Sequence, residues 1–489
     1  MSNEAPAAPG NAAGPTRPEA PGAAPTASGG GVGTTSSRLG AGTIARYAIG
    51  SLGTGGFATL PGLVLTYYLT DSLGVAALAA GAVITIAKVW DVIIDPVIGA
   101  LTDRDLARHG SRRRLMLIGA CALPVLFALT FAVPPALGPL AAGIWVLLAF
   151  TFTATAFSLF QVPYIALPAE LTPRYDERTR LLTWRVVVLT LAILLFGAGG
   201  PALRRVSDDP VIGYLVMGIV CGVVIGLGML VSTTVARRTV PAPAPVAAPA
   251  AEKTGIREHY AAGIRALRRS RPFRLLLATF VLQALATGLM LAGAQYVATW
   301  VLHSEAAVEL LFIALIAPAL LAAPGWGVVA RRIGKERTFA IASIVFGVAA
   351  LTILGVLWAP GDWIYVPVGI AGIAYAGMQS LPMAMLPDVI SHDERTHPDA
   401  AAGAGRAGAF SGVWTAGETV GFALGATTLS LILAMTGYVS RAAGQVVEQP
   451  DAAVTGIVVS FSLAPAVLIA LSLVALARYP LRRTDIDLS

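Results

Sequence analysis

The sequence predicts an all-α membrane protein in which about twelve transmembrane helices form two pseudo-symmetric six-helix bundles. Of its 489 residues, 56% are hydrophobic and only 12% are charged, about half the charged fraction of a soluble chain. Apolar runs of about 20 residues, long enough to cross a bilayer, recur between short charged segments. A hydrophilic gap at residues 236–272 separates six such runs from six others.

The apolar runs set the expected bounds of the spans. Those of the first half are 43–70, 78–101, 115–133, 140–167, 182–203 and 211–235. Those of the second half are 273–301, 306–330, 338–358, 363–386, 407–435 and 454–477. They predict bundles at 43–235 and 273–478, joined by a cytoplasmic linker at 236–272. Residues 1–42 are largely Ala, Pro, Gly, Ser and Thr, so we expect a disordered cytoplasmic tail there and a second cytoplasmic tail at 479–489.

Positive charge gathers in every second connection between the runs. These connections hold Arg104, Arg108, Arg112, Arg113, Arg114, Arg174, Arg178, Arg180, the basic residues of the linker, Arg331, Arg332, Lys335, Arg337, Arg395 and Arg406. The other connections hold little beyond Arg204, Arg205 and Arg441. The positive-inside rule then predicts cytoplasmic termini in a plasma or inner membrane protein. Because the net charge of +7 comes from short segments, it indicates no nucleic-acid surface.

The two halves share a sequence pattern. The second run is followed by Gly99, Asp103-Arg104, Gly110 and Arg112-Arg113, and the eighth by Gly325, Arg331-Arg332, Gly334-Lys335 and Arg337. Internal repeats of this kind are typical of transporters that hold their substrate near the midplane between the halves.

Three ionisable residues, Lys88, Asp91 and Asp95, interrupt the second apolar run. Their spacing of i, i+3 and i+7 places them on one face of a helix. If that helix ends near Asp103, Asp95 and Asp91 lie roughly 12 and 18 Å inside its end, near mid-membrane. An ionised carboxylate at that depth costs at least ~2.5 kcal/mol and normally faces a bundle interior or a wet cavity on an ion or substrate path. The alternative is a buried structural ion pair, but with two acids and one base one carboxylate remains without a partner charge.

Further polar residues lie in the fourth and fifth runs: Ser158, Gln161, Tyr164 and Arg185. Pro163 and Pro168 predict a break in the fourth helix near Gln161. Arg185 lies about one turn inside an apolar run, where a cation needs a carboxylate or a polar substrate, although it can also snorkel to the nearby interface.

Glu418 is the isolated acid of the eleventh run, about a dozen residues past Arg406 and hence roughly 18 Å deep. We expect it in the central cavity, opposite Asp91 and Asp95. Like charges in a poorly solvated site disfavour joint ionisation, which favours coupling to protons.

Five charged residues near the cytoplasmic ends of the runs are candidates for ion-pair gates: Asp103, Arg104, Arg178, Asp388 and Arg406. Asp388 and Arg406 flank one loop, so we expect them to pair. The alternative for most of these residues is a solvated face that only sets topology.

Five segments carry a family resemblance. They are Lys88-x-Trp-Asp91-x-x-x-Asp95-Pro, Asp103-Arg104…Arg108-x-Gly110-x-Arg112, Pro163-Tyr164-x-Ala-Leu…Glu170-Leu-Thr…Glu177-Arg178-Thr, Arg185, and Leu386-Pro-Asp388…Arg406-x-Gly408-x-Phe410. Spread over both halves, they resemble the glycoside–pentoside–hexuronide:cation symporters of the major facilitator superfamily. The resemblance implies the major facilitator fold and cation-coupled uptake of a small polar solute by alternating access.

The resemblance also suggests roles for individual residues. It implies that Asp91 and Asp95 bind the cation, that Lys88 matches a basic position of their site, and that Arg185 matches a position associated with sugar binding. The full expected cation-coupling set is Lys88, Asp91, Asp95, Ser158 and Glu418. The expected substrate-binding set is Gln161, Tyr164, Arg185 and Trp414.

The chain departs from the sugar-transporting members at three places. Thr54-Gly55-Gly56 and Gln161 stand where those members have acids, and Ile165 stands where they have an aromatic residue. Glu418 falls where many members carry a lysine. This replacement of a base by an acid favours a positively charged or zwitterionic substrate or a rearranged proton path. The family also includes transporters of lysolipids and amino acids.

The leading hypothesis is a secondary active transporter that couples H⁺ or Na⁺ to a small polar solute, sugar-like, zwitterionic or cationic. Alternatives are a non-transporting membrane sensor or scaffold on the same fold, and a lysolipid or amino-acid transporter of the same family. We expect no enzyme and no metal or cofactor, because the helices hold no nucleophile–base pair or ligand set and the five histidines lack ligand spacing. The expected partners are the solute, the coupling cation and the lipid bilayer, with no nucleic acid, and we expect a functional monomer.

Overall fold

The structure, a computed structural model, describes residues 38–172, 174–236, 264–265, 267–397 and 404–481. These residues contain twelve helices long and apolar enough to cross a membrane, and no strand longer than an isolated bridge between Leu73 and Ala442. The predicted all-α fold of about twelve spans is therefore confirmed. The chain from Leu39 onward makes up one compact unit.

The helices follow the apolar runs of the sequence. Those of the first bundle are α1 Ala41–Ala48, α2 Ser51–Asp71, α3 Ala77–His109, α4 Arg113–Phe131, α5 Pro139–Leu171, α6 Tyr175–Arg204 and α7 Pro210–Thr233, of which α1 and α2 make one span. Those of the second bundle are α9 Arg271–Tyr296, α10 Ala307–Ile333, α11 Lys335–Ile353, α12 Tyr365–Thr396, α13 Ala404–Met435, α14 Asp451–Phe461 and α15 Leu463–Ala477. Short turns, η1 Val297–Val301, η2 Leu354–Leu357 and η3 Asp362–Ile364, extend α9 and α11 and precede α12.

Two local expectations were wrong. The helix of the second span does not end near Asp103 but continues to His109, where Gly110 takes the left-handed conformation (φ 67°) that ends a helix. The fourth span is not broken near Gln161, because α5 runs without interruption through Pro163 and Pro168. Packing of α5 against α3 and α4 holds the helix across its prolines, as neighbouring helices do in membranes.

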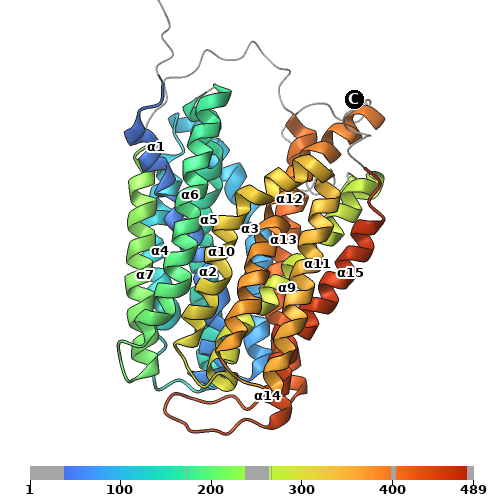
Figure 1. Cartoon of the computed structure of the whole chain (residues 1–489). Coiled ribbons are helices and arrows are strands. Elements are labelled where there is room, and N and C mark those ends of the chain that lie inside the picture. The colour runs from blue at the N-terminus through green and yellow to red at the C-terminus, as the bar shows by residue number, and fades with distance from the viewer. Residues whose placement is uncertain (1–37, 173, 237–263, 266, 398–403, 482–489) are drawn as a thin grey trace, which may run out of the picture. The chain divides into compact units, whose positions relative to one another are not determined.

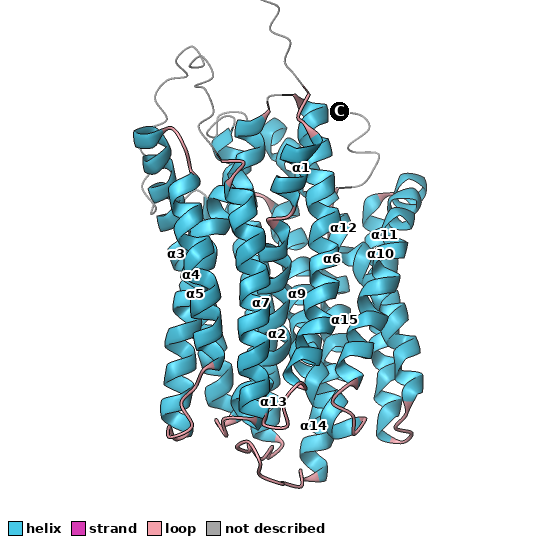
Figure 2. Ribbon diagram, turned by 90° about the vertical axis from the view of Figure 1, so that its left-hand side faces the viewer, coloured by secondary structure: helices cyan, strands magenta, loops and turns pink. Residues whose placement is uncertain are grey.

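The helices form two bundles (Figures 1 and 2). Within the first bundle α4 packs on α5 and α7, α3 on α5, and α2 on α6; within the second, α9 packs on α13 and α15, and α12 on α10 and α11. Between the bundles, α2 contacts α9, α3 contacts α13, and α6 contacts α10. We call the end where α7 stops and α9 begins the linker end, and the opposite end the loop end. Figure 1 shows the two groups of helices closer together at the loop end.

Glycines at the contact between the bundles bring their helices close together. A Cβ atom on Gly81 of α3 would lie 2.6 Å from Cβ of Ser430 in α13, and one on Gly197 of α6 would lie 2.0 Å from the ring of Phe312 in α10. Gly81 and Gly197 both belong to the loop-end halves of their helices. The bundles are therefore packed most tightly at the loop end.

We expect Gly81→Ala to lower the unfolding temperature of the detergent-solubilised protein, because the added methyl group collides with Ser430 and overpacking costs about 1–3 kcal/mol. Gly412→Ala in α13 is the matched control, since nothing lies within 4 Å of the added atom. Equal unfolding temperatures for the two variants would show that this contact is not tight.

Candidate functional site

The acidic pair of α3 lies inside the first bundle. Lys88 Nζ is 3.0 Å from Asp91 Oδ2, and its ammonium group also lies 5.7 Å from the centre of the Phe57 ring. Ser158 of α5 is a polar neighbour of the Asp95 carboxylate. The Lys88 and Asp91 side chains are only 27% and 13% exposed. The opposite face of α3 carries the strongly exposed apolar side chains Ile86, Val89 and Ile93.

These carboxylates keep free acceptor capacity. The Oδ1 atoms of both Asp91 and Asp95 are buried and have no hydrogen-bond partner among the described residues. One base, Lys88, lies beside two acids. Carboxylate and hydroxyl oxygens are the ligands that hard cations prefer, and a carboxylate in a membrane bundle readily takes a proton. The cluster of Asp91, Asp95, Ser158 and Lys88, here called the α3 acidic site, has the chemistry to hold a proton or a small cation.

A second polar group lies where α2, α5 and α6 approach one another. Thr54 Oγ1 donates to Gln161 Oε1 at 2.8 Å. The Arg185 guanidinium lies 5.5 Å from the centre of the Tyr164 ring, and its Nε is buried without a hydrogen-bond partner in the described chain. Arg185 therefore points into the protein and retains a donor for a ligand.

Tyr164 is held by its own bundle. Its ring is fully buried, and its hydroxyl lies 3.0 Å from Ser51 Oγ and donates to the Tyr47 carbonyl at 2.9 Å. This arrangement fixes the aromatic face on which Arg185 rests. The substrate-binding role of Tyr164 stays a prediction.

Trp414 and Glu418 belong to the second bundle, on α13. Trp414 is 2% exposed and stacks on Phe280 with ring centres 4.3 Å apart, while its indole Nε1 has no partner among the described residues. Glu418 is partly buried near Tyr375 of α12, whose hydroxyl accepts a hydrogen bond from Gln379 Nε2 at 2.6 Å.

Glu418 does not join the α3 acidic site in this structure. The charged neighbours of Asp95 are Asp91 and Lys88, and the described residues contain no group of three or more acidic, histidine or cysteine side chains that could hold a metal ion. The expectation that Glu418 lies in the central cavity opposite Asp91 and Asp95 stays a prediction. The two sets lie on helices of different bundles, α13 and α3.

Two sets of ion pairs at the linker end lie within single bundles. Arg112 lies 2.9 Å from Asp103 and 2.5 Å from Glu170, which ties α3, α4 and α5 together. In the second bundle Lys335 pairs with Asp388 at 2.6 Å.

The remaining gate candidates are less defined. Arg104 is exposed, and Arg178 Nη2 donates to the Thr172 carbonyl at 3.2 Å. Asp388 has Lys335 as its partner, whereas the side chain of Arg406 is outside the described part of the structure. The expected pairing of Asp388 with Arg406 therefore stays a prediction.

Ion pairs at the loop end join the two bundles, and sequence reasoning missed them. Three arginines take part, and their partners are 3.3, 2.5 and 3.1 Å away: Arg204 with Glu305, Arg205 with Glu309, and Arg441 with Asp71. The sequence indicated only that these were the few bases on that side. The sequence did offer one signal for these pairs, because acidic residues lie at or near the ends of apolar runs on the same side of the membrane as the three arginines. The structure is thus closed at the loop end.

Comparisons with known proteins agree with this arrangement. Residues 46–483 match the family model described as MFS/sugar transport protein. The chain is 24% identical over 448 residues to the glucuronide carrier protein homolog of Escherichia coli (strain K12), covering 90% of this chain and 92% of that one. It is also 24% identical over 455 residues to the human sodium-dependent lysophosphatidylcholine symporter 1, covering 84% and 78%.

Other matches are shorter. The chain is 30% identical over 191 residues to the putative glycoside/cation symporter YagG of Escherichia coli (strain K12), which is 38% of this chain and 40% of that one. The match to the uncharacterized symporter sll1374 of Synechocystis, at 33% identity, spans 30% of that relative. The chain therefore spans well under half the length of some of these relatives.

Solved structures show the same fold. The crystal structure of the D-xylose-proton symporter matches with a TM-score of 0.64 at 12% identity, covering 90% of this chain and 97% of that one. The bacterial homologue of the human lysosomal transporter Spinster, in an inward-facing and unoccupied conformation, matches with a TM-score of 0.61 at 14% identity, covering 90% and 95%. The matched family model confirms the resemblance to the glycoside–pentoside–hexuronide:cation symporters, and the chain belongs to the MFS/sugar transport protein family.

Proposed function

We propose that the protein is a secondary active symporter that moves a small polar solute together with H⁺ or Na⁺ by alternating access. The observation that carries the proposal is the α3 acidic site, where two carboxylates inside the first bundle keep buried oxygen atoms without partners. Several relatives bear the name symporter, which supports the same activity here. The proposal includes no enzymatic activity and no cofactor.

The coupling ion acts on the α3 acidic site. Lys88 neutralises Asp91, with which it pairs at 3.0 Å, so Asp95 is the carboxylate left to take a proton or a Na⁺ ion. Ser158 adds a hydroxyl oxygen next to it. Neutralising the surplus charge removes a cost of at least ~2.5 kcal/mol for keeping it in the membrane. The occupied bundle is then free to rearrange.

The substrate binds between the bundles, with Arg185 and Gln161 on the first and Trp414 and Glu418 on the second. The free Nε of Arg185 suits a hydroxyl or carboxylate, and Glu418 favours a positive group. A polar solute, sugar-like or zwitterionic, satisfies both. Relatives are named for a glycoside, a glucuronide and a lysophosphatidylcholine, so a lysolipid or amino-acid substrate is the alternative.

The conformation fits one half of the transport cycle. Ion pairs tie the bundles together at the loop end, whereas those named at the linker end lie within a bundle. The positive charge of the connections at the linker end supports a cytoplasmic linker and cytoplasmic termini in a plasma or inner membrane. We therefore assign the structure to an inward-facing state of a monomer.

We expect Asp95→Asn and Asp91→Asn to reduce accumulation by more than about tenfold in proteoliposomes with an imposed pH or Na⁺ gradient, because the amide removes a charge worth at least ~2.5 kcal/mol at depth. Solute counterflow, which needs no net cation movement, should persist. Asp362→Asn, an exposed substitution in η3, is the matched control.

Two outcomes would contradict this assignment. Normal gradient-driven accumulation in both Asp95→Asn and Asp91→Asn would remove the α3 acidic site from coupling. Saturable binding without flux of any solute from a metabolite panel would instead favour the membrane sensor. Comparing pH and Na⁺ gradients in the wild-type protein identifies the coupling ion.

We expect Arg185→Gln to raise the KM for counterflow roughly 10- to 100-fold, because a hydrogen bond from a charged donor contributes about 1.5–3 kcal/mol. Arg478→Gln removes an exposed arginine past α15 and should leave the KM unchanged. An unchanged KM in Arg185→Gln would place that arginine outside the substrate site.

A further inference from the structure

The connection between α13 and α14, residues 436–450 and here called the strap, lies against the far end of α2. The strap belongs to the second bundle and α2 to the first. Arg441 N donates to the Thr70 carbonyl at 2.9 Å, and Ala443 N donates to the Ser72 carbonyl at 3.0 Å. Two backbone hydrogen bonds therefore join the bundles at the loop end.

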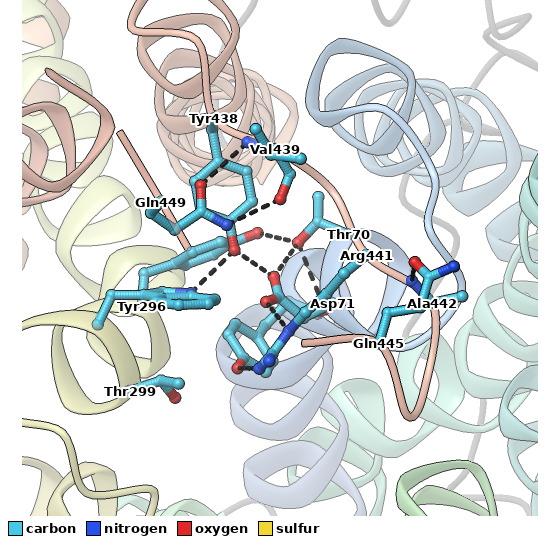
Figure 3. A network of polar contacts seen from close by, with 12 residues as sticks. Thr70, Asp71, Tyr296, Thr299, Tyr438, Val439, Arg441, Ala442, Gln445 and Gln449 are labelled. Carbon is cyan, nitrogen blue, oxygen red and sulfur yellow. Dashed lines mark hydrogen bonds and ion pairs between the residues drawn. The ribbon is translucent and has the colours of Figure 1, made fainter. Parts of the chain in front are cut away.

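Two side chains of the strap, those of Tyr438 and Arg441, converge on one buried carboxylate (Figure 3). The side chain of Asp71, the last residue of α2, is 1% exposed. Its Oδ1 accepts from Arg441 Nε at 3.1 Å, and its Oδ2 accepts from Tyr438 Oη at 2.5 Å and from Thr70 Oγ1 at 2.8 Å. If the strap moved away, Asp71 would lose two of these three donors and keep only Thr70.

Tyr438 and Arg441, the two strap residues that donate to Asp71, also contact the second bundle. Trp300 of η1 donates from Nε1 to the Tyr438 hydroxyl at 2.9 Å, and the Arg441 guanidinium lies 4.7 Å from the centre of the Trp300 ring. Burial and, after it, the Asp71 carboxylate raise the pKa of the Tyr438 hydroxyl. The hydroxyl therefore keeps its proton and remains a donor to Asp71.

The strap is braced independently of the first bundle. Val439 N donates to Gln449 Oε1 at 3.0 Å, and Gln449 Nε2 donates back to the Val439 carbonyl at 2.8 Å. Gly437 and Gly444 adopt positive φ angles of 74° and 79°, which other residues rarely do. These contacts within the strap allow it to move together with the second bundle.

A cavity of about 350 Å³ lies where the strap meets the first bundle. Strap residues 441–446 line one part of it, and Tyr67, Arg204 and Tyr214 line another. Arg204 is 6% exposed and donates to the Tyr214 hydroxyl at 3.0 Å. The strap therefore covers a space between the bundles at the loop end.

We propose that the strap is the gate of the loop end, held shut by the Asp71–Arg441 pair and by the backbone bridge to α2, and released when the transporter opens to that side. The proposal rests on the alternating-access function proposed above and adds the segment that closes the path. Substrate entering from the loop end passes only after both contacts have separated.

A reversible cross-link tests the gate. Leu73 and Ala442 face one another in the antiparallel bridge, where Cα atoms are about 4.5–5.5 Å apart and within disulfide range. In a Cys121→Ala/Cys221→Ala background, the Leu73→Cys/Ala442→Cys pair should lose counterflow on oxidation and regain it on reduction. Each single cysteine variant should keep counterflow under the same oxidant. Full counterflow in the cross-linked protein would overturn the proposal while leaving the transport function intact.

A second measurement needs no substrate. Spin labels at Val206→Cys and Val446→Cys, which replace side chains 70% and 96% exposed, report the separation of the first bundle from the strap. Asp71→Asn should add a population of longer distances that the otherwise unsubstituted labelled protein lacks. Asp209→Asn is the matched control, because Asp209 caps α7 at the same end and bonds Val211 within its own bundle. An unchanged distance distribution in Asp71→Asn would overturn the gate even if no solute is ever found to move.

Discussion

The feature on which the rest of this structure depends is a surplus carboxylate held inside an apolar helix bundle. Asp91 and Asp95 share one base, Lys88, and each keeps a buried Oδ1 without a partner among the described residues. Lipid would not tolerate such a charge, so the bundle must enclose it, and the exposed apolar face of α3 shows that it does. The site is enclosed and still lacks a full set of partners, which supports the coupling role proposed for it.

The polar contacts at the two ends of the protein differ in kind. Arg112 and Lys335 make their pairs within single bundles, whereas Arg441 and Asp71 join one bundle to the other. A pair within a bundle survives rigid-body rotation of that bundle, but a pair between bundles does not. The Arg441–Asp71 pair at the loop end therefore depends on conformation, whereas the pairs of Arg112 and Lys335 do not. The close approach of Gly81 to Ser430 lies in the same half and reinforces the closure.

Sequence reasoning succeeded where the signal is local. Apolar runs located the spans, and the i, i+3, i+7 spacing placed Lys88, Asp91 and Asp95 on one face, because both follow from helix geometry and membrane thickness. Sequence reasoning failed where the packing of neighbouring helices determines the local structure. Pro163 does not break α5, since adjacent helices hold it in place.

Contacts between distant segments were the second gap in the prediction. The sequence contains nothing that relates Asp71 to Arg441, which are 370 residues apart and belong to different bundles. The depth of Glu418 in the membrane can be read from its position along the helix, but the residues that it faces cannot. Its neighbour Tyr375 lies in the same bundle. Contacts between residues so far apart in the sequence are determined by how the whole bundles pack.

The magnitudes explain why the proposed coupling requires two ligands. Moving a two-state equilibrium from about 1:99 to about 99:1 needs roughly 5.5 kcal/mol of differential binding. Neutralising one carboxylate at depth yields at least ~2.5 kcal/mol, and one charge-assisted hydrogen bond from Arg185 to a solute yields about 1.5–3 kcal/mol. Neither alone reaches the requirement, whereas both together approach it. In the proposed mechanism a cation at Asp95 alone, or a solute at Arg185 alone, shifts the equilibrium only part of the way, and this mutual dependence is the physical condition for symport.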